Sequence, residues 1–166
     1  DVAAAEVTME NAWAVRLGAE LRALVAHIEA ANKSTFMPVA GTSFLLKIGP
    51  EDAAGYDWDW SAKYLDDIVA ELMAAFTIAA EVEGIEGGLT ARLAADYALE
   101  RGSALLSVDG PESVVRVTRD GVNELVAQAV DNGQSLNELT KALEEHHQFS
   151  KSRARTIART ETAEAL

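Results

Sequence analysis

The sequence predicts a mainly α-helical protein, an extended helical bundle with a long N-terminal helix and at most one small β-hairpin. Alanine supplies much of the 49% hydrophobic content, and 166 residues include only 11 glycines and three prolines. Such a composition favours helix over sheet. In addition, apolar residues recur at steps of three and four in most segments, which is typical of helices with one buried face.

Residues 3–32 are expected to form one long helix of about 45 Å. Its apolar stripe consists of Met9, Trp13, Leu17, Leu21, Leu24 and Ile28. This length has two interpretations. The segment is either a core helix of a bundle or a helix that extends along another chain in a coiled-coil-like contact.

Residues 33–60 interrupt the helical pattern. Short apolar runs bounded by Gly and Pro predict a hairpin or an ordered loop here. Trp58 and Trp60 lie near its end, each preceded by an aspartate. They are candidates for a partner-binding loop, since tryptophan is enriched at interaction hot spots. The alternative is that they hold the loop against the body of the protein.

Two further helices are expected over residues 61–83 and 89–107. The first has an apolar stripe of Leu65, Ile68, Leu72, Phe76 and Ala79, and the second has Leu89, Leu93, Tyr97 and Ala104 along one side. Gly84, Gly87 and Gly88 separate the two helices, as glycine does at many helix ends.

The next two helices have recognisable starts. Pro111 suits the first position of a helix whose apolar face is Val115, Val122, Val126 and Ala129. After Gly133, Ser135 and Glu138 form a capping box. That box begins a helix whose core face is Leu136, Leu139 and Leu143.

Residues 149–165 predict a closing helix with two different faces. One face is narrow and made mostly of small residues, namely Ser150, Ala154, Ile157, Ala158, Glu161 and Ala165. The other carries Lys151, Arg155, Arg159 and Thr162. Because burial of an unpaired carboxylate is costly, Glu161 is expected to meet an Arg or a run of backbone N–H groups.

The charge balance argues against a general nucleic-acid-binding surface. The formal net charge is −13, from 14 basic and 27 acidic residues. Residues 151–166 are an exception, because four of them are basic and only two are acidic. Lys151, Arg155 and Arg159 are therefore candidate phosphate contacts, although no aromatic residues are interleaved to stack on bases.

The sequence predicts no enzyme, cofactor site or metal site. There is no cysteine, and no phosphate-binding, dinucleotide-binding or nucleophile-elbow motif is present. His146 and His147 follow two glutamates, but adjacent histidines on a helix point about 100° apart and do not converge on one ion. No apolar run approaches the ~20 residues of a membrane span.

The closing helix also carries a sequence resemblance. Its residues Arg153, Ala154, Ile157, Ala158, Arg159, Thr160, Glu161, Thr162 and Ala163 resemble the Arg-Ala-x-x-Ile-Ala-Arg-Thr-Glu-Thr-Ala signature of the phage Mu F-like head-morphogenesis family. Tyr97-Ala98-x-x-Arg101-Gly102 and the segment from Gly133 to Leu139 are similar to earlier parts of the family pattern. The resemblance divides the chain into a helical N-terminal region, residues 1–88, and a Mu F-like module, residues 89–166.

The resemblance implies a minor head protein that associates with the portal or capsid protein of the same phage. It would sit in the virion, at the head or portal vertex, with a role in head morphogenesis and in DNA packaging or ejection. One alternative is the delivery module of a phage-borne or polymorphic toxin whose catalytic domain lies beyond Leu166, because family members usually continue past the signature. A second is a portal-fused segment that contacts packaged DNA through residues 151–159.

Overall fold

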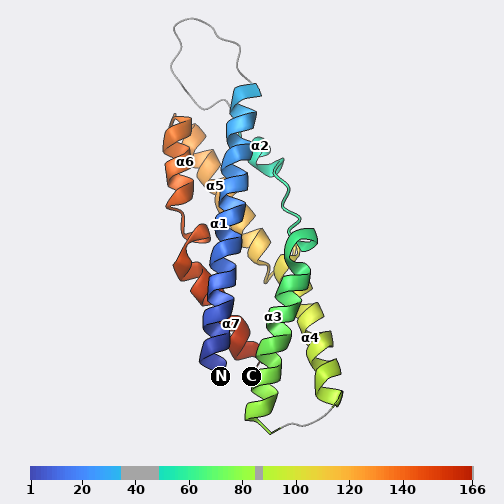
Figure 1. The fold of residues 1–166 in the computed structure, drawn as a ribbon. Helices are drawn as coiled ribbons and strands as arrows, with labels where there is room; N and C mark the ends of the chain where they lie inside the picture. The colour runs from blue at the N-terminus through green and yellow to red at the C-terminus, as the bar shows by residue number, and fades with distance from the viewer. Residues whose placement is uncertain (35–48, 85–87, 166) are drawn as a thin grey trace, which may run out of the picture.

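The computed structural model describes residues 1–34, 49–84 and 88–165, and every regular element in those ranges is a helix. In chain order these are α1 (Val2–Ser34), α2 (Pro50–Ala54), α3 (Ser61–Val82), α4 (Gly88–Leu106), α5 (Val114–Asp131), α6 (Leu136–Glu144), the 3₁₀ helix η1 (His147–Phe149) and α7 (Lys151–Ala165). The predicted fold class, an extended helical bundle, is confirmed (Figure 1). Residues 35–48 of the predicted hairpin or loop lie outside the described residues, and α2 occupies part of the remainder.

α1 runs the length of the bundle, about 50 Å at the usual helical rise. Its predicted stripe is buried, with Leu21 only partly covered. The helix packs against α7 and α3, and also against α6 and η1. The two ends of the chain therefore lie together at one end of the bundle (Figure 1).

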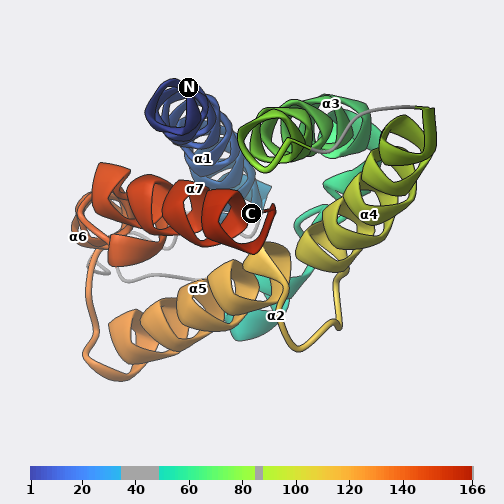
Figure 2. The same cartoon turned by 90° about the horizontal axis from the view of Figure 1, so that it is seen from below.

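α3 and α4 form a helical hairpin beside α1. Viewed from below, α1 and α3 lie side by side along one edge, α7 lies beneath both, and α4 covers the far side of α3 (Figure 2). α3 ends at Val82, and two residues later Gly84 has a φ of 71°, the left-handed conformation that glycine adopts without strain. Gly102 of α4 permits the close approach, because a Cβ there would lie 3.3 Å from Val69.

The predicted apolar side of α4 is buried only in part, because Tyr97 packs against the core but Leu93 does not. The burial of Leu89 lies outside the described residues. Leu93 is 52% exposed, and Ala94, Ala98, Leu105 and Leu106 are buried instead. α4 packs mainly on α3, and alanines allow that close contact. The spacing of the larger side chains therefore did not identify Ala94 and Ala98 as buried residues of α4.

The start of α5 also differs from its prediction. Ser113, not the segment at Pro111, precedes the helix, and its hydroxyl accepts a hydrogen bond from the backbone N–H of Arg116 at 3.1 Å. The predicted face of α5 is buried as expected. The capping box at Ser135 and Glu138 is confirmed, and α6 buries Leu139 and Leu143.

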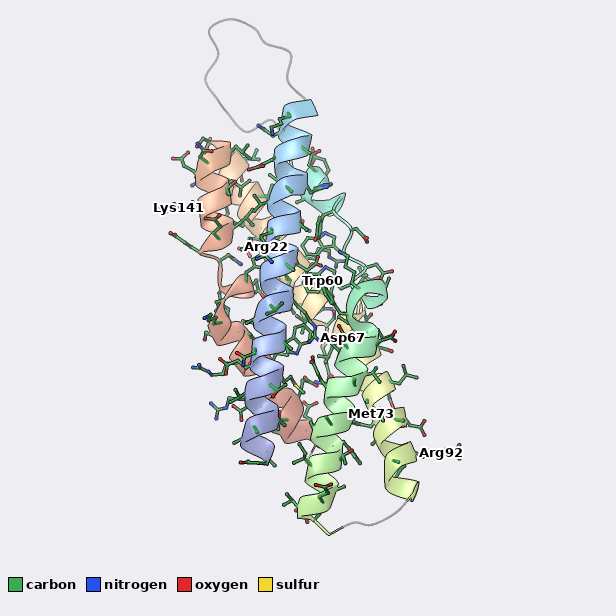
Figure 3. All side chains as sticks on the ribbon, viewed as in Figure 1. Arg22, Trp60, Asp67, Met73, Arg92 and Lys141 are labelled. Carbon is green, nitrogen blue, oxygen red and sulfur yellow. The ribbon has the colours of Figure 1, made fainter. Side chains whose placement is uncertain are left out.

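One hydrophobic core draws residues from both predicted regions, residues 1–88 and 89–166. Trp58 and Trp60 belong to it, with exposures of 5% and 0%. A partner-binding tip needs exposed indoles, so the structure supports the other interpretation, in which they hold the segment against the body. Trp60 points into the bundle between α1 and α3 (Figure 3), and the Trp58 indole N–H donates to the carbonyl of Ala53 at 3.1 Å.

Among the described helices, none has the length and apolar character needed to cross a membrane.

Candidate functional site

The signature helix α7 is the candidate site, and one of its faces is buried in the bundle. Ser150 caps its start by accepting a hydrogen bond from the N–H of Arg153 at 3.1 Å. The predicted small face is buried, from Ala154 to Ala165. Arg153 and Thr162 are buried as well, which corrects the assignment of Thr162 to the outward face. α7 thus buries more than one narrow stripe, because α1 covers one side of it and α3 another.

Glu161 meets an arginine, as its burial requires. Its carboxylate accepts two hydrogen bonds from Arg101 of α4, from Nε at 2.7 Å and from Nη2 at 2.9 Å. The Glu161 side chain is 3% exposed and that of Arg101 is 14% exposed. This two-pronged geometry suits the planar guanidinium and is among the stronger polar contacts in proteins.

Two more carboxylates complete what we term the Arg101 cluster, which consists of Arg101, Glu112, Glu161 and Glu164. Glu164 lies 2.8 Å from Arg101 Nη2, and Glu112 accepts from Nη1. Their side chains are 47% and 65% exposed, so water solvates both. Arg101 therefore joins α4, the start of α5 and α7 through one guanidinium.

The cluster shapes the electrostatics of its surroundings. Hydrogen bonding to Glu161 raises the pKa of Arg101 above its already high ordinary value, despite the opposing effect of burial. Burial, followed by the Glu161 charge, raises the pKa of the neighbouring Tyr97 hydroxyl. The Arg101 guanidinium is thus permanently charged.

The basic stripe of α7 faces acidic residues of α1. Arg155 donates to Glu10 through Nε and Nη2, both at 3.1 Å, and Arg159 lies 3.7 Å from Glu6. Lys151 is exposed at the start of the helix. Two of the three candidate phosphate contacts therefore already have carboxylate partners within the chain.

Arg153 has a different environment from the rest of the basic set. It is 8% exposed, and its Nη2 donates to the carbonyl of Val114 at 3.3 Å. Burial lowers the pKa of its guanidinium to about 10, which remains far above neutral pH. Arg153 therefore links α7 to the first residue of α5 and is not available at the surface.

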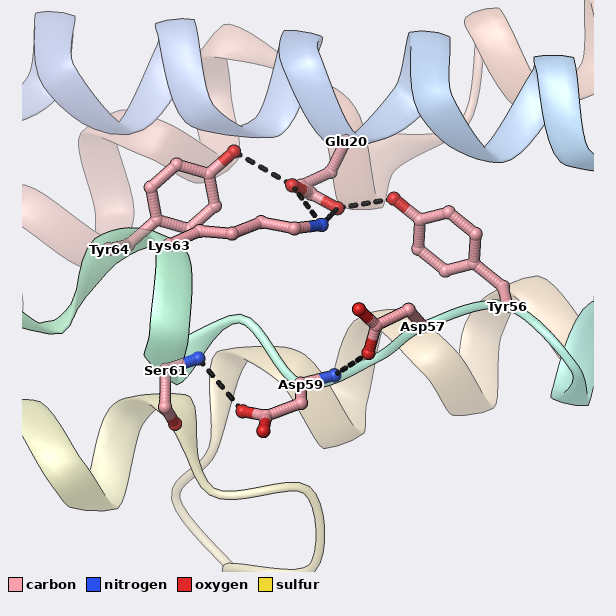
Figure 4. Close-up of polar contacts among 7 residues, drawn as sticks. All are labelled: Glu20, Tyr56, Asp57, Asp59, Ser61, Lys63 and Tyr64. Carbon is pink, nitrogen blue, oxygen red and sulfur yellow. Dashed lines mark hydrogen bonds and ion pairs between the residues drawn. The ribbon is translucent and has the colours of Figure 1, made fainter.

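A second buried polar group lies between α1 and α3, and the sequence interpretation missed it. The Glu20 cluster consists of Glu20, Tyr56, Lys63 and Tyr64 (Figure 4). Glu20 is 3% exposed and accepts hydrogen bonds from Tyr56, from Tyr64 at 2.7 Å and from Lys63 at 3.2 Å. Burial and the Glu20 hydrogen bond raise the pKa of Tyr64 to about 12, so both tyrosines remain donors.

Spacing could have identified Glu20 and Arg101. Glu20 lies three residues after Leu17 and four before Leu24, on the buried stripe of α1. Arg101 lies three residues after the buried Ala98. Arg101 and Glu161 are 60 residues apart in sequence, so no local pattern could pair them.

The histidines and carboxylates do not assemble a metal site in the part of the chain that the structure describes. His146 caps η1, where its Nδ1 accepts a hydrogen bond from the N–H of Gln148 at 3.4 Å. Burial lowers the pKa of His146 below its ordinary value. Its position is therefore accounted for by local structure.

Comparison with known proteins supports the sequence resemblance over the C-terminal part of the chain. The model of the family described as phage Mu protein F like protein matches residues 120–166. This match includes the whole of α7 with Glu161, but not Arg101. No curated protein and no solved structure matches the chain. The family match indicates a phage head-related protein.

Proposed function

We propose, from the family match over residues 120–166, that this protein is a minor head protein of a bacteriophage. It would act in head morphogenesis by docking to the portal or capsid protein of the same phage, without a catalytic step. The observation that carries this proposal is the signature helix itself, which the family match contains and which Glu161 ties to the body.

The geometry supports different tasks for the buried and the exposed surfaces of the protein. Six of the nine signature residues face inward, and Arg159, Thr160 and Ala163 are exposed. Of the inward-facing residues, Glu161 is held by Arg101, and Arg153 by the carbonyl of Val114. We therefore assign the signature a structural task, which is to lock α7 to α4 and α5. Contact with the portal or capsid protein then falls to surfaces other than the buried face of α7.

A direct role in DNA binding is less well supported. A phosphate would have to displace Glu10 from Arg155 and Glu6 from Arg159, and the net charge of −13 would repel the duplex. DNA binding that weakens steeply with salt and is lost in Arg155→Glu/Arg159→Glu would favour the DNA alternative. Binding that is absent, or insensitive to salt, would remove it.

The test of the main proposal is light scattering after size exclusion, with this chain alone and with the portal or major capsid protein of the same genome. A stable complex supports the head-protein role. The matched genetic test deletes the gene from the phage and counts normal heads by electron microscopy, with and without the wild-type gene supplied in trans. Normal heads and normal infectivity without the gene would refute the proposal and favour the toxin-delivery alternative.

A further inference from the structure

The outer face of α1 carries no charge over about five helical turns. Between Asp1 and Arg22 the exposed residues are Ala3, Ala4, Val7, Thr8, Asn11 and Val15. Val7 and Val15 are 57% and 69% exposed, among the most exposed large apolar residues of the described chain. We term this surface the neutral face of α1. It is unusual in a protein of which 25% of residues are charged.

The neutral face is not explained by a lack of charged residues in this part of α1. Four occur between Val2 and Leu21, and each turns toward the bundle, where it meets an opposite charge. Glu6 pairs with Arg159, Glu10 with Arg155, Arg16 with Glu71 and Glu20 with Lys63. The helix therefore places its charges on the inner and lateral sides and leaves its outer side neutral.

Gly18 lies in the same helix without a role in the fold. A glycine inside a helix costs about 1 kcal/mol relative to alanine. A Cβ at Gly18 would meet only the Arg22 guanidinium, at an ordinary contact distance of 3.6 Å. Packing within the chain therefore does not require this glycine, whereas close approach of a second backbone would.

The neutral face continues into shallow grooves shared with α3. One groove of about 420 Å³ has four alanines among its nine lining residues, together with the acidic Asp1 and Glu71. A neighbouring groove of about 380 Å³ is lined by Asn11, Ala12, Val15, Ala19, Tyr64 and Asp67 among others. α1 and α3 lie side by side along this edge of the molecule, and no described helix covers them there (Figure 2). The surface thus combines the exposed valines of α1 with grooves that hold small side chains near α1 and charged side chains, such as Glu71 and Asp67, on α3.

We propose that the neutral face of α1 binds a second copy of this chain, with the two α1 helices antiparallel and crossing at Asn11. In this register Val7 of one copy meets Val15 of the other, and Ala4 meets Gly18. The Asn11 amides face each other and can exchange hydrogen bonds. The valines of each copy then lie against the α1 side of the grooves of the other.

Charge is the reason for choosing a second copy. The first charged side chains at the two ends of the neutral face are Asp1 and Arg22, which have opposite signs. Antiparallel pairing about Asn11 brings Asp1 of each copy close to Arg22 of the other, which gives two equivalent pairs of opposite charge. Two chains of charge −13 repel each other over most of their surfaces, and a neutral face is where they can approach at the lowest electrostatic cost.

The size of the face sets the expected affinity. From Ala3 to Arg22 the helix spans about 29 Å, and one helix is about 10 Å wide, so the neutral face of α1 projects to roughly 300 Å². Contact with the adjoining α3 edge would bring the total to roughly 600 Å². This is below the ~800 Å² per partner of standard interfaces. We therefore expect a reversible dimer with micromolar affinity, which strengthens with added salt because salt screens the repulsion between the acidic bodies.

The first test measures the mass of the chain by light scattering at increasing concentration. The 17.7 kDa chain should double in mass, and Val15→Arg should remain monomeric. The matched control is Leu99→Arg, since Leu99 is 54% exposed on α4 and lies off the neutral face. A wild-type chain that is monomeric at several hundred micromolar, or a Leu99→Arg variant as monomeric as Val15→Arg, would overturn the proposal.

The second test uses the absence of cysteine from the chain. A disulfide requires the two Cα atoms to come within about 7 Å, which antiparallel crossing at residue 11 allows for Asn11→Cys. Mild oxidation should link this variant into dimers at least tenfold faster than Val130→Cys, which places a thiol on α5. Equal rates would overturn the register. If the wild-type chain is monomeric and binds another head protein, and Val15→Arg abolishes that binding, then the neutral face belongs to the contact with that protein and the dimer proposal is overturned.

Discussion

Glu161 can be tested against Glu164, because both carboxylates contact Arg101 but only one is buried. Removing one partner of a buried ion pair costs about 3–5 kcal/mol, since the other charge is left uncompensated. Arg101 would keep Glu112 and Glu164, whose side chains are 65% and 47% exposed. We therefore expect Glu161→Ala to lower the free energy of unfolding by about 3 kcal/mol, the lower end of that range.

Glu164→Ala is the matched control, three residues away on the same helix. Its side chain is 47% exposed, and solvent-exposed pairs contribute about 0.2–1 kcal/mol. In a chain of this size each kcal/mol shifts the melting temperature by about 2–4 °C. Glu161→Ala should therefore melt about 6–12 °C lower, and Glu164→Ala no more than about 4 °C lower.

Urea denaturation followed by circular dichroism measures these differences, and a double-mutant cycle isolates the contact. Arg101→Ala, Glu161→Ala and the double variant should give a coupling free energy of about 2 kcal/mol or more, in the range found for interacting residues. If the two single glutamate variants unfold at the same urea concentration, or the cycle gives no coupling, then Glu161 does not hold α7 in place and the reasoning fails.

Three further variants probe other parts of the molecule. Trp60→Ala should lower the free energy of unfolding by about 3–5 kcal/mol, the usual loss for a buried tryptophan. An unchanged urea midpoint would show that Trp60 is not in the core. His146 accepts from the N–H of Gln148, and burial lowers its pKa. The contribution of neutral His146 to the free energy of unfolding should therefore be fully present above about pH 6.5 and be lost as the pH falls through the lowered pKa. His146→Asn keeps a hydrogen-bond acceptor that does not titrate, so its melting temperature should fall less steeply with decreasing pH. Arg155→Glu should lower the melting temperature slightly by facing Glu10, and adding Glu10→Arg should recover it; no recovery would mean that the pair does not form.

Much of the fold could be predicted because long helices repeat their apolar residues. The stripe from Met9 to Ile28 and the capping box at Ser135 both identified elements that the structure contains. α4 was the exception, because alanines, Ala94 and Ala98, form the buried face before Leu105 and Leu106 near its end. Alanine has too little apolar area to distinguish a buried position from an exposed one by periodicity.

The site was less predictable, for a physical reason. The position of Glu161 on the small face indicated burial, and burial indicated a cationic or N–H partner. Choosing Arg101 required the three-dimensional arrangement of α4 and α7. The basic stripe was likewise visible in the sequence, but its pairing with α1 was not, because Glu10 and Arg155 are 145 residues apart.

The contact between the first and last helices has a consequence for synthesis of the protein. A ribosome adds about 5–20 residues per second, so α1 is complete roughly 7–26 s before α7. During this interval part of the inner face of α1 has no partner, and Glu6 and Glu10 have not yet met their arginines. The nascent chain thus presents a long amphipathic helix to cellular chaperones, and the bundle can close only after the signature helix has left the exit tunnel.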